Sequence, residues 1–163
     1  MTTPPQTAEP VIRRELTVPL SMEGAFALFT EGLARWWPPA YTWSQDVLDT
    51  IAMEPWVNGR CYERGPHDFT CDWGRVLAWE PPHRLVFTWQ ISPDRAPEPN
   101  PTRASEVEVR FEAKGALSTR LAFVHRYFGR HGADGARYRA MLDAPEGWST
   151  ILNAYAEQAG RQV

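Results

Sequence analysis

YERGPHDFTCDWGRVLAWEPPHRLVFTWQI, residues 62–91, contains three runs rich in aromatic and β-branched residues. Turn-forming residues separate these runs. Gly65-Pro66-His67-Asp68 lies between the first and the second, and Pro81-Pro82 lies between the second and the third. Strand-forming runs that are interrupted by short turn signals are typical of an antiparallel meander. We therefore expect three consecutive strands, each paired with its neighbour along the chain.

The third run alternates between apolar and mostly polar side chains. Leu85, Phe87, Trp89 and Ile91 fall on one face of the predicted strand, and Arg84, Val86, Thr88 and Gln90 fall on the other. A sheet with one apolar face must be covered by another element. The second run, Asp72–Glu80, is apolar on both faces. Its orientation stays open, because a one-residue slip exchanges the two faces of a strand.

The remaining chain supplies further strands and short helices. Ser21 is a plausible N-cap of an amphipathic helix that runs to about Trp37 and can break near residues 30–32. Ser92–Ala104 contains four prolines, which favours an irregular connection, either a lid over a cavity or a plain surface loop. Further strands are predicted at Val11–Val18, Val47–Pro55, Gly59–Arg64, Ser105–Ala113 and Ser118–Arg126, and a short helix at Asp134–Leu142.

The C-terminal region predicts a long amphipathic helix. Asp143 as a cap, Pro145 in the first turn and Glu146 three residues after the cap are helix-start signals. Gly160 is the predicted end. An apolar stripe follows the helical period at Trp148, Ile151, Leu152, Tyr155 and Ala159. A helix of about four turns is long enough to lie across the sheet, so we expect it to be the cover.

Length and composition limit the class of protein. The 163 residues suit one domain, which we place at residues 11–163 after a flexible tail at residues 1–10. A net charge of −3 without a basic cluster argues against nucleic-acid binding. No apolar run approaches the length of a membrane span, and the first residues do not resemble a signal peptide, so a cytoplasmic location is expected. The eight tryptophans favour a deep core or an aromatic pocket.

The sequence carries none of the common catalytic or phosphate-binding motifs, which favours a protein that is not an enzyme without excluding one. No cofactor is expected. No metal is expected either, because Cys61 and Cys71 form no CxxC pair. If the hairpin turns at Pro66–Phe69, Tyr62 faces Trp73, Cys61 faces Gly74 and Cys71 faces Arg64. The two sulfurs are then not cross-strand partners, and a disulfide is not expected.

Three local patterns carry a resemblance to a known superfamily. They are FTEGLARWWP at residues 29–38, GRCYER at 59–64 leading to WGRVLAWEPPHRLV at 73–86, and GW at 147–148. With the order of elements, they resemble the SRPBCC (START-like, Bet v 1-like) superfamily, in its bacterial branch related to activators of the heat-shock chaperone ATPase. The resemblance implies an α+β helix-grip fold, in which a curved antiparallel sheet of about six or seven strands wraps a long C-terminal helix, with short helices between the first two strands. It also implies a cavity between sheet and helix.

Ten residues are candidates to line such a cavity. His125 is the one histidine placed on an inward face, and we interpret it either as a hydrogen-bonding or basic group in the cavity or as a satisfied histidine at a strand end. Arg14 shares a face with apolar residues and either anchors an anion or lies in solvent. Plain core packing is the alternative for each aromatic residue. The full set is Arg14, Trp37, Tyr62, Trp73, Trp89, Phe123, His125, Trp148, Leu152 and Tyr155.

Three functions fit these observations, and the resemblance does not choose among them. The first is binding of a small, mostly apolar or aromatic molecule in the cavity between the sheet and the C-terminal helix. The second is an enzyme of the cyclase, dehydratase or hydrolase kind that uses the same cavity. The third is a module that contacts a chaperone or a regulator through its surface. A homodimer is compatible with each of them.

Overall fold

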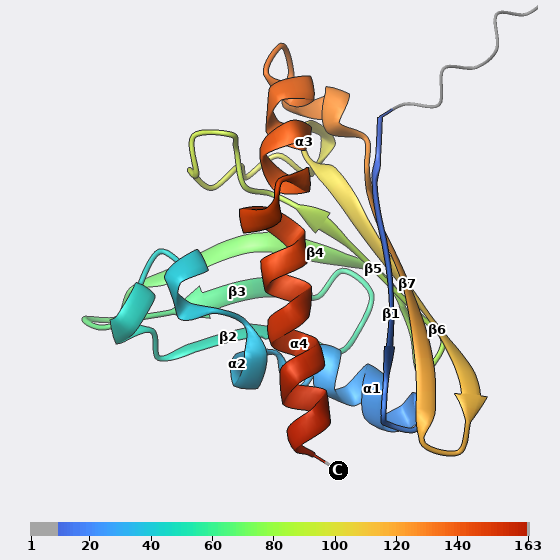
Figure 1. The fold of residues 1–163 in the computed structure, drawn as a ribbon. Coiled ribbons are helices and arrows are strands. Elements are labelled where there is room, and N and C mark those ends of the chain that lie inside the picture. Colours follow the sequence, from blue (N-terminus) through green and yellow to red (C-terminus); the bar gives the residue numbers. More distant parts are fainter. Residues whose placement is uncertain (1–9, 163) are drawn as a thin grey trace, which may run out of the picture.

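A computed structural model describes residues 10–162, which form a curved antiparallel sheet wrapped around a C-terminal helix (Figure 1). The sheet has seven strands in the order β1-β7-β6-β5-β4-β3-β2. This arrangement confirms the predicted α+β helix-grip fold. The strands are β1 (Ile12–Val18), β2 (Thr50–Met53), β3 (Arg60–Arg64), β4 (Thr70–Glu80), β5 (Arg84–Trp89), β6 (Ser105–Gly115) and β7 (Ser118–Arg126).

Short helices connect the first two strands, as predicted. The Ser21 hydroxyl accepts a hydrogen bond from the Gly24 amide at 3.0 Å and caps the first helix. The predicted break near residues 30–32 is present. The helical segments of this connection are α1 (Met22–Phe29), α2 (Leu33–Trp36), η1 (Pro39–Tyr41) and η2 (Gln45–Val47).

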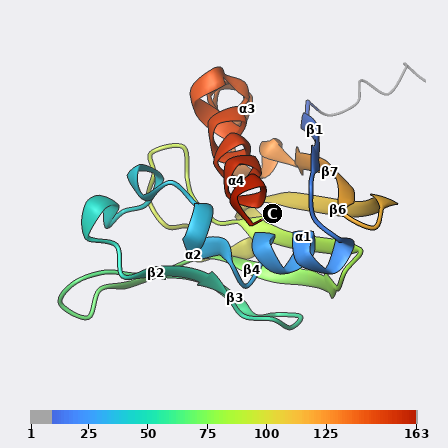
Figure 2. The ribbon, with the colours of Figure 1, turned by 60° about the horizontal axis from the view of Figure 1, so that its bottom comes forward.

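The C-terminal cover is shorter than expected, because the chain between α3 (Gly135–Asp143) and α4 (Thr150–Arg161) is kinked. The turn η5 (Pro145–Ser149) contains Gly147 in a non-helical conformation, with φ −89° and ψ −126°. The prediction of one helix capped by Asp143 is therefore wrong, and so is the predicted end at Gly160, since α4 continues to Arg161. In an end-on view, α4 lies on the concave side of the sheet together with α1 and α2 (Figure 2).

Two β-bulges determine which side chains of β4, the strand that contains the second run (residues 72–80), point into the core. Cys61 pairs with Gly74 as predicted, but Tyr62 pairs with Asp72, so Trp73 is an extra residue in β4 and the predicted Tyr62–Trp73 pair is wrong. Leu77 is a second extra residue, because Val76 pairs with Phe87 and Ala78 with Val86. Trp73 is therefore buried in the core, whereas Leu77 is 42% exposed.

Three smaller expectations concern the rest of the chain. Cys61 and Cys71 are both free thiols. The tail predicted at residues 1–10 lies almost wholly outside the described residues. None of the described helices has the length and apolar character needed to span a membrane.

Candidate functional site

Four buried indole rings, from segments that are distant in the sequence, pack against one another. We call Trp37, Trp73, Trp89 and Trp148 the tryptophan cluster, and each of them is at most 5% exposed. The rings of Trp37 and Trp73 are stacked, with centroids 5.9 Å apart and 25° between their planes. The centroid of Trp148 lies 5.1 Å from that of Trp89 and 6.0 Å from that of Trp37. The cluster therefore joins α2, β4, β5 and η5, which are distant in the sequence.

Local backbone features place each ring of the cluster. Trp37 is the C-cap of α2, just before Pro38 and Pro39. Trp73 points inward because of the first bulge in β4. Trp89 ends β5 on the inward face predicted from its alternation, and Trp148 follows the non-helical Gly147.

Two other predicted residues adjoin the tryptophan cluster, and two more lie in the same hydrophobic core. The ring centroids of Phe123 and His125 lie 4.5 Å and 5.8 Å from that of Trp148. Leu152 is buried on α4. Tyr155, also on α4, packs on Phe29, and its hydroxyl donates to the Ala25 carbonyl at 2.8 Å. The structure thus brings eight of the ten candidates together.

Arg14 and Tyr62 do not join this group. The Arg14 guanidinium donates to the Ser149 hydroxyl at 3.1 Å and to the Asp143 carboxylate at 2.9 Å, so it ties β1 to the kink before α4. The Tyr62 ring is half-buried on the other face of β3, near the guanidinium groups of Arg60 and Arg64.

The indole N–H groups of the cluster differ in their hydrogen bonds. Trp89 Nε1 donates to the Tyr138 hydroxyl at 2.7 Å, and Trp148 Nε1 donates to His125 Nδ1 at 2.9 Å. Trp37 Nε1 donates to the Tyr41 carbonyl at 3.4 Å. Trp73 Nε1 is buried and has no acceptor among the described residues. A buried donor without a partner is rare in native proteins and costs about 1–3 kcal/mol.

A chain of polar groups leads from the cluster towards the surface. Ser105 Oγ lies 2.6 Å from His125 Nε2 and 2.7 Å from His131 Nε2. Ser105 and His125 are fully buried, whereas His131 is half-buried in η4 (Phe128–His131). Neither Ser105 nor His131 was among the residues predicted for the site from the sequence. The alternation of β6 places Ser105 on the same face as Val107, so the signal for Ser105 was present.

Burial lowers the pKa of both histidines in this series of hydrogen-bonded groups. Burial, and to a smaller extent the neighbouring His131, lower the pKa of His125 well below its usual value. Burial also lowers the pKa of His131, an effect that Glu98 partly opposes. The carboxylate of Glu98 therefore favours a positive charge on His131 more than on His125.

We expect the free energy of unfolding to fall as the pH is lowered from 7 to 5. The unfolded chain takes up protons at its histidines near pH 6.5, but the folded chain resists protonation of His125, so the unfolded state binds more protons. The loss approaches about 1.4 kcal/mol per pH unit for His125 and is smaller for half-buried His131. Denaturant titrations of the wild type, His125→Gln and the exposed control His83→Gln test this. A slope that His125→Gln retains in full would contradict it.

Hydrogen bonds join the β1–β2 connection to η5 and to the loop after β5. The Tyr41 hydroxyl donates to the Glu146 carbonyl at 2.6 Å, which joins η1 to η5. Trp43 Nε1 donates to the Arg95 carbonyl at 2.7 Å, which joins the same connection to the loop after β5. In Figure 1 this connection and this loop lie on the same side of α4. Both hydrogen bonds are exposed, so water can replace them at little cost.

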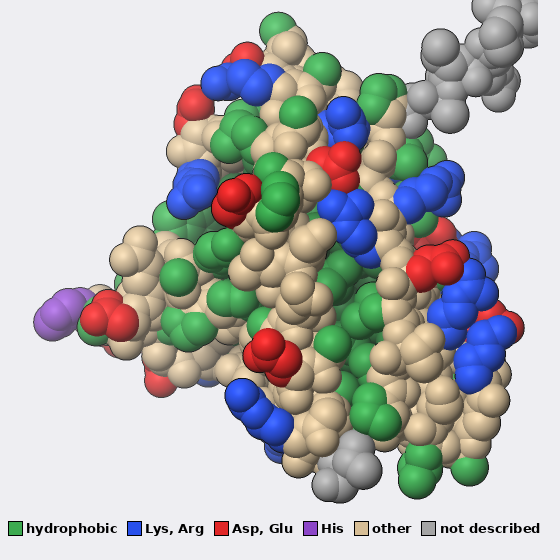
Figure 3. Space-filling model, in the orientation of Figure 1, with side chains coloured by type: hydrophobic (Ala, Val, Ile, Leu, Met, Phe, Trp, Pro, Cys, Tyr) green, Lys and Arg blue, Asp and Glu red, His purple; other side chains and the backbone are tan. Residues whose placement is uncertain are grey.

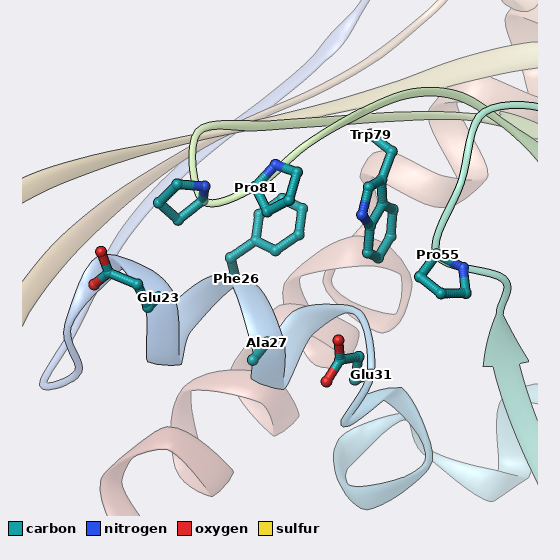
Figure 4. A pocket seen from close by; sticks show the side chains of 8 residues that line it. Glu23, Phe26, Ala27, Glu31, Pro55, Trp79 and Pro81 are labelled. Carbon is teal, nitrogen blue, oxygen red and sulfur yellow. The ribbon is translucent and has the colours of Figure 1, made fainter.

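Two hollows in the surface of residues 10–162 lie away from the tryptophan cluster. A hollow of about 410 Å³ lies between α1 and the β4–β5 turn, with Phe26 and Trp79 at its base and Glu23 and Glu31 at its rim (Figure 4). Another, of about 310 Å³, lies on the outer face of the sheet. Hydrophobic side chains are exposed on both sides of α4, and charged ones gather near the β1, β7 and β6 edge (Figure 3). Among residues 10–162, no group of His, Cys, Asp or Glu suited to a metal ion is found.

Comparison with known proteins gives the family. The sequence model described as "Activator of Hsp90 ATPase homolog 1-like protein" matches residues 19–158. A comparison with curated proteins finds no match.

Solved structures with similar folds cover nearly the whole chain. The anthrahydroquino-γ-pyrone synthase Txn09, complexed with SUM, is 37% identical, with 91% of this chain and 96% of that chain covered and a TM-score of 0.65. CalC, a self-sacrificing resistance protein from Micromonospora echinospora, is 26% identical, with 94% and 96% covered and a TM-score of 0.64. NE0264 from Nitrosomonas europaea is 15% identical, with 95% and 97% covered and a TM-score of 0.65, which is a likeness of fold alone.

These matches confirm the family predicted from the sequence. The match to the family spans both helices of the β1–β2 connection, the sheet from β2 to β7 and most of α4. The chain belongs to the family of Activator of Hsp90 ATPase homolog 1-like proteins, in the SRPBCC superfamily.

Proposed function

We propose that this protein binds a planar aromatic molecule that carries an acceptor oxygen, between the concave face of the sheet and the C-terminal helix. The observation that carries this proposal is the buried N–H of Trp73, which lacks an acceptor. A ligand oxygen at hydrogen-bond distance would remove the cost of this unpaired donor. The surrounding indole rings offer flat apolar surfaces on which an aromatic ring stacks.

Binding requires the tryptophan cluster to open, because its own rings fill the space. Trp37 is the ring best placed to move. It directly precedes the η1–η2 connection (residues 39–47), whose first part is joined to its neighbours through the exposed hydrogen bonds of Tyr41 and Trp43. The buried carboxylate of Glu63 holds the connection farther along, at the Trp43 and Ser44 amides. The hydrogen bond of Trp37 itself, to the Tyr41 carbonyl, is long at 3.4 Å. Outward movement of this connection would separate Trp37 from Trp73 and leave room for a flat ligand beside the Trp73 N–H.

The relatives support a ligand of this chemistry. Txn09 is named as a synthase of an anthrahydroquino-γ-pyrone, and this name describes fused flat rings that carry oxygen atoms. This chain shares 37% of its residues with Txn09 over nearly its full length. Catalysis on such a molecule is a second candidate function, and the hydrogen-bonded Ser105, His125 and His131 favour it. A surface-interaction module has less support, since exposed large apolar residues such as Trp56, Leu117 and Met141 lie in separate places, the β2–β3 turn, the β6–β7 turn and α3.

Anthraquinone and anthracene, which differ in their carbonyl oxygens, provide the test. We expect Trp73→Phe to weaken anthraquinone binding about fivefold to tenfold, the value of one neutral hydrogen bond, and to leave anthracene binding nearly unchanged. Quenching of tryptophan fluorescence and isothermal titration measure both affinities. Absence of any binding by the wild type, or equal losses for the two probes, would contradict the proposal.

Trp89→Phe is the matched control for stability. Both indoles are buried, but Trp89 donates a hydrogen bond to Tyr138, whereas Trp73 donates none. We therefore expect ligand-free Trp73→Phe to be about 1–3 kcal/mol more stable than Trp89→Phe in denaturant titrations. Equal stabilities would indicate that the Trp73 N–H is satisfied in solution.

A further inference from the structure

We propose that His125, Ser105 and His131 form a proton relay, in which His125 Nδ1 removes a proton from a hydroxyl group of the bound aromatic molecule. This inference rests on the proposed ligand site and extends it from binding to acid–base chemistry. The substrate class is a hydroxylated planar aromatic molecule. The relay is carried by the hydrogen bonds among Trp148, His125, Ser105 and His131.

The hydrogen bond from Trp148 determines which nitrogen of His125 carries the proton. Trp148 Nε1 can only donate, so His125 Nδ1 accepts at 2.9 Å. A neutral His125 therefore carries its hydrogen on Nε2 and donates it to Ser105 Oγ at 2.6 Å. The direction of the first link of the chain follows from this tautomer.

The second link follows in the same direction. Ser105 Oγ accepts from His125, so its own hydrogen is free to point to His131 Nε2 at 2.7 Å. The Ser105 amide also donates to His131 Nε2, at 3.3 Å, which marks this nitrogen as an acceptor. Every donor in the chain thus points from the tryptophan cluster towards half-buried His131.

Trp148 occupies the place that a ligand hydroxyl would take. Among residues 10–162, its indole N–H is the one donor to His125 Nδ1. Trp148 follows Gly147 in the kinked turn η5, and the Glu146 carbonyl of that turn accepts the hydrogen bond from Tyr41. Opening of the η1–η2 connection therefore also releases a contact that holds η5. A hydroxyl that replaces the indole N–H would be in direct contact with the base.

Proton transfer along this chain balances without a further reactant. His125 Nδ1 takes the hydroxyl proton, and the oxygen keeps the electron pair as a phenolate. The Nε2 proton of His125 passes to Ser105 Oγ, and the Ser105 proton passes to His131 Nε2. The positive charge ends on His131, and the reverse steps return the proton. A phenolate is an oxygen nucleophile, so the relay suits reactions in which a ring hydroxyl attacks carbon.

The groups around the relay favour a positive charge on His131, at the end of the relay farthest from the tryptophan cluster. Trp89, Phe128 and Trp148 surround the His125 ring and carry no charge. The His131 ring is packed against Tyr138 of α3, whose hydroxyl stays neutral because burial raises its pKa. The carboxylate of Glu98 lies close enough to favour a charged His131. An imidazolium is thus better tolerated at His131 than at His125.

Alizarin, a dihydroxyanthraquinone, tests the relay because its phenolate has a distinct visible spectrum. We expect the bound dye to ionise at least about one pH unit below the free dye in the wild type. His125→Gln should abolish this shift, and Ser105→Ala and His131→Gln should reduce it. His83→Gln, at an exposed histidine, is the matched control and should keep the full shift.

Anthraquinone, which has no hydroxyl group, separates failure of the relay from failure of the proposed site. If anthraquinone binds to the wild type and alizarin ionises at its free pH, the relay is overturned and the ligand site stands. If neither probe binds, the proposed function fails as well. If Ser105→Ala folds and keeps the full alizarin shift, Ser105 is not part of the relay and the proposal is overturned. Circular dichroism of each variant checks folding.

Discussion

Replacing Gly147 with alanine is expected to destabilise the protein by at least about 3 kcal/mol. A Cβ atom at this position would lie 2.1 Å from the carbonyl oxygen of Leu142 and 2.5 Å from its carbonyl carbon, both of which are backbone atoms. The α3–η5 junction would have to shift, and Trp148 would move with it.

Gly160→Ala is the matched control, because it makes the same chemical change in α4. A Cβ atom at Gly160 would meet no atom within 4 Å, and alanine has the better helix propensity. We expect this variant to gain up to about 1 kcal/mol. Denaturant titrations of the two variants beside the wild type measure both effects. A cost below about 1 kcal/mol for Gly147→Ala would show that the kink tolerates a side chain.

Replacing Glu63 with alanine is expected to cost about 3 kcal/mol. Its carboxylate is 1% exposed and accepts hydrogen bonds from the Trp43 amide at 3.0 Å, the Ser44 amide at 3.0 Å and the Ser44 hydroxyl at 2.8 Å. Alanine would leave these donors without an acceptor, and the η1–η2 connection would lose its attachment to β3. Faster hydrogen exchange of the Trp43 and Ser44 amides should accompany the loss.

Glu157→Ala is a suitable control, since it removes an exposed glutamate from α4. Its effect on stability should stay within about 0.5 kcal/mol. If Glu63→Ala behaved like this control, the three hydrogen bonds would not hold the connection in solution. Glu63→Ala also tests the ligand site, because the η1–η2 connection carries Tyr41 and Trp43. These two residues join the connection to η5 and to the loop after β5. A loosened connection should admit anthraquinone faster than in the wild type.

Local patterns predicted the fold, because periodicity and turn chemistry are properties of neighbouring residues. The alternation in β5 identified the inward face that carries Leu85, Phe87 and Trp89, all of which pack in the hydrophobic core of the structure. The helical spacing of Ile151, Leu152 and Tyr155 identified the buried stripe of α4. The Ser21 cap and the break between α1 and α2 were also predictable.

Contacts between distant parts of the chain position the groups of the candidate site, and local sequence patterns do not reveal such contacts. Strict alternation cannot show that Trp73 and Leu77 are bulge residues, because a bulge depends on the hydrogen bonds that each strand makes with its partners. Arg14 was ambiguous on its strand, and its partners Asp143 and Ser149 lie more than a hundred residues away. His131 contacts Ser105 because η4 packs against the start of β6, a strand that lies more than ten residues earlier in the chain.

The residue pattern of this protein was therefore sufficient to predict the curved sheet, the covering helix and the inward direction of Trp89 and His125. It could not reveal which indole N–H lacks an acceptor or which groups hydrogen-bond to His125. Burial of an apolar side chain depends mainly on the face of the element that carries it, and that face is encoded locally. A hydrogen bond depends on distances within a few tenths of an ångström between segments far apart in the chain, and those distances exist only once the sheet has closed around α4.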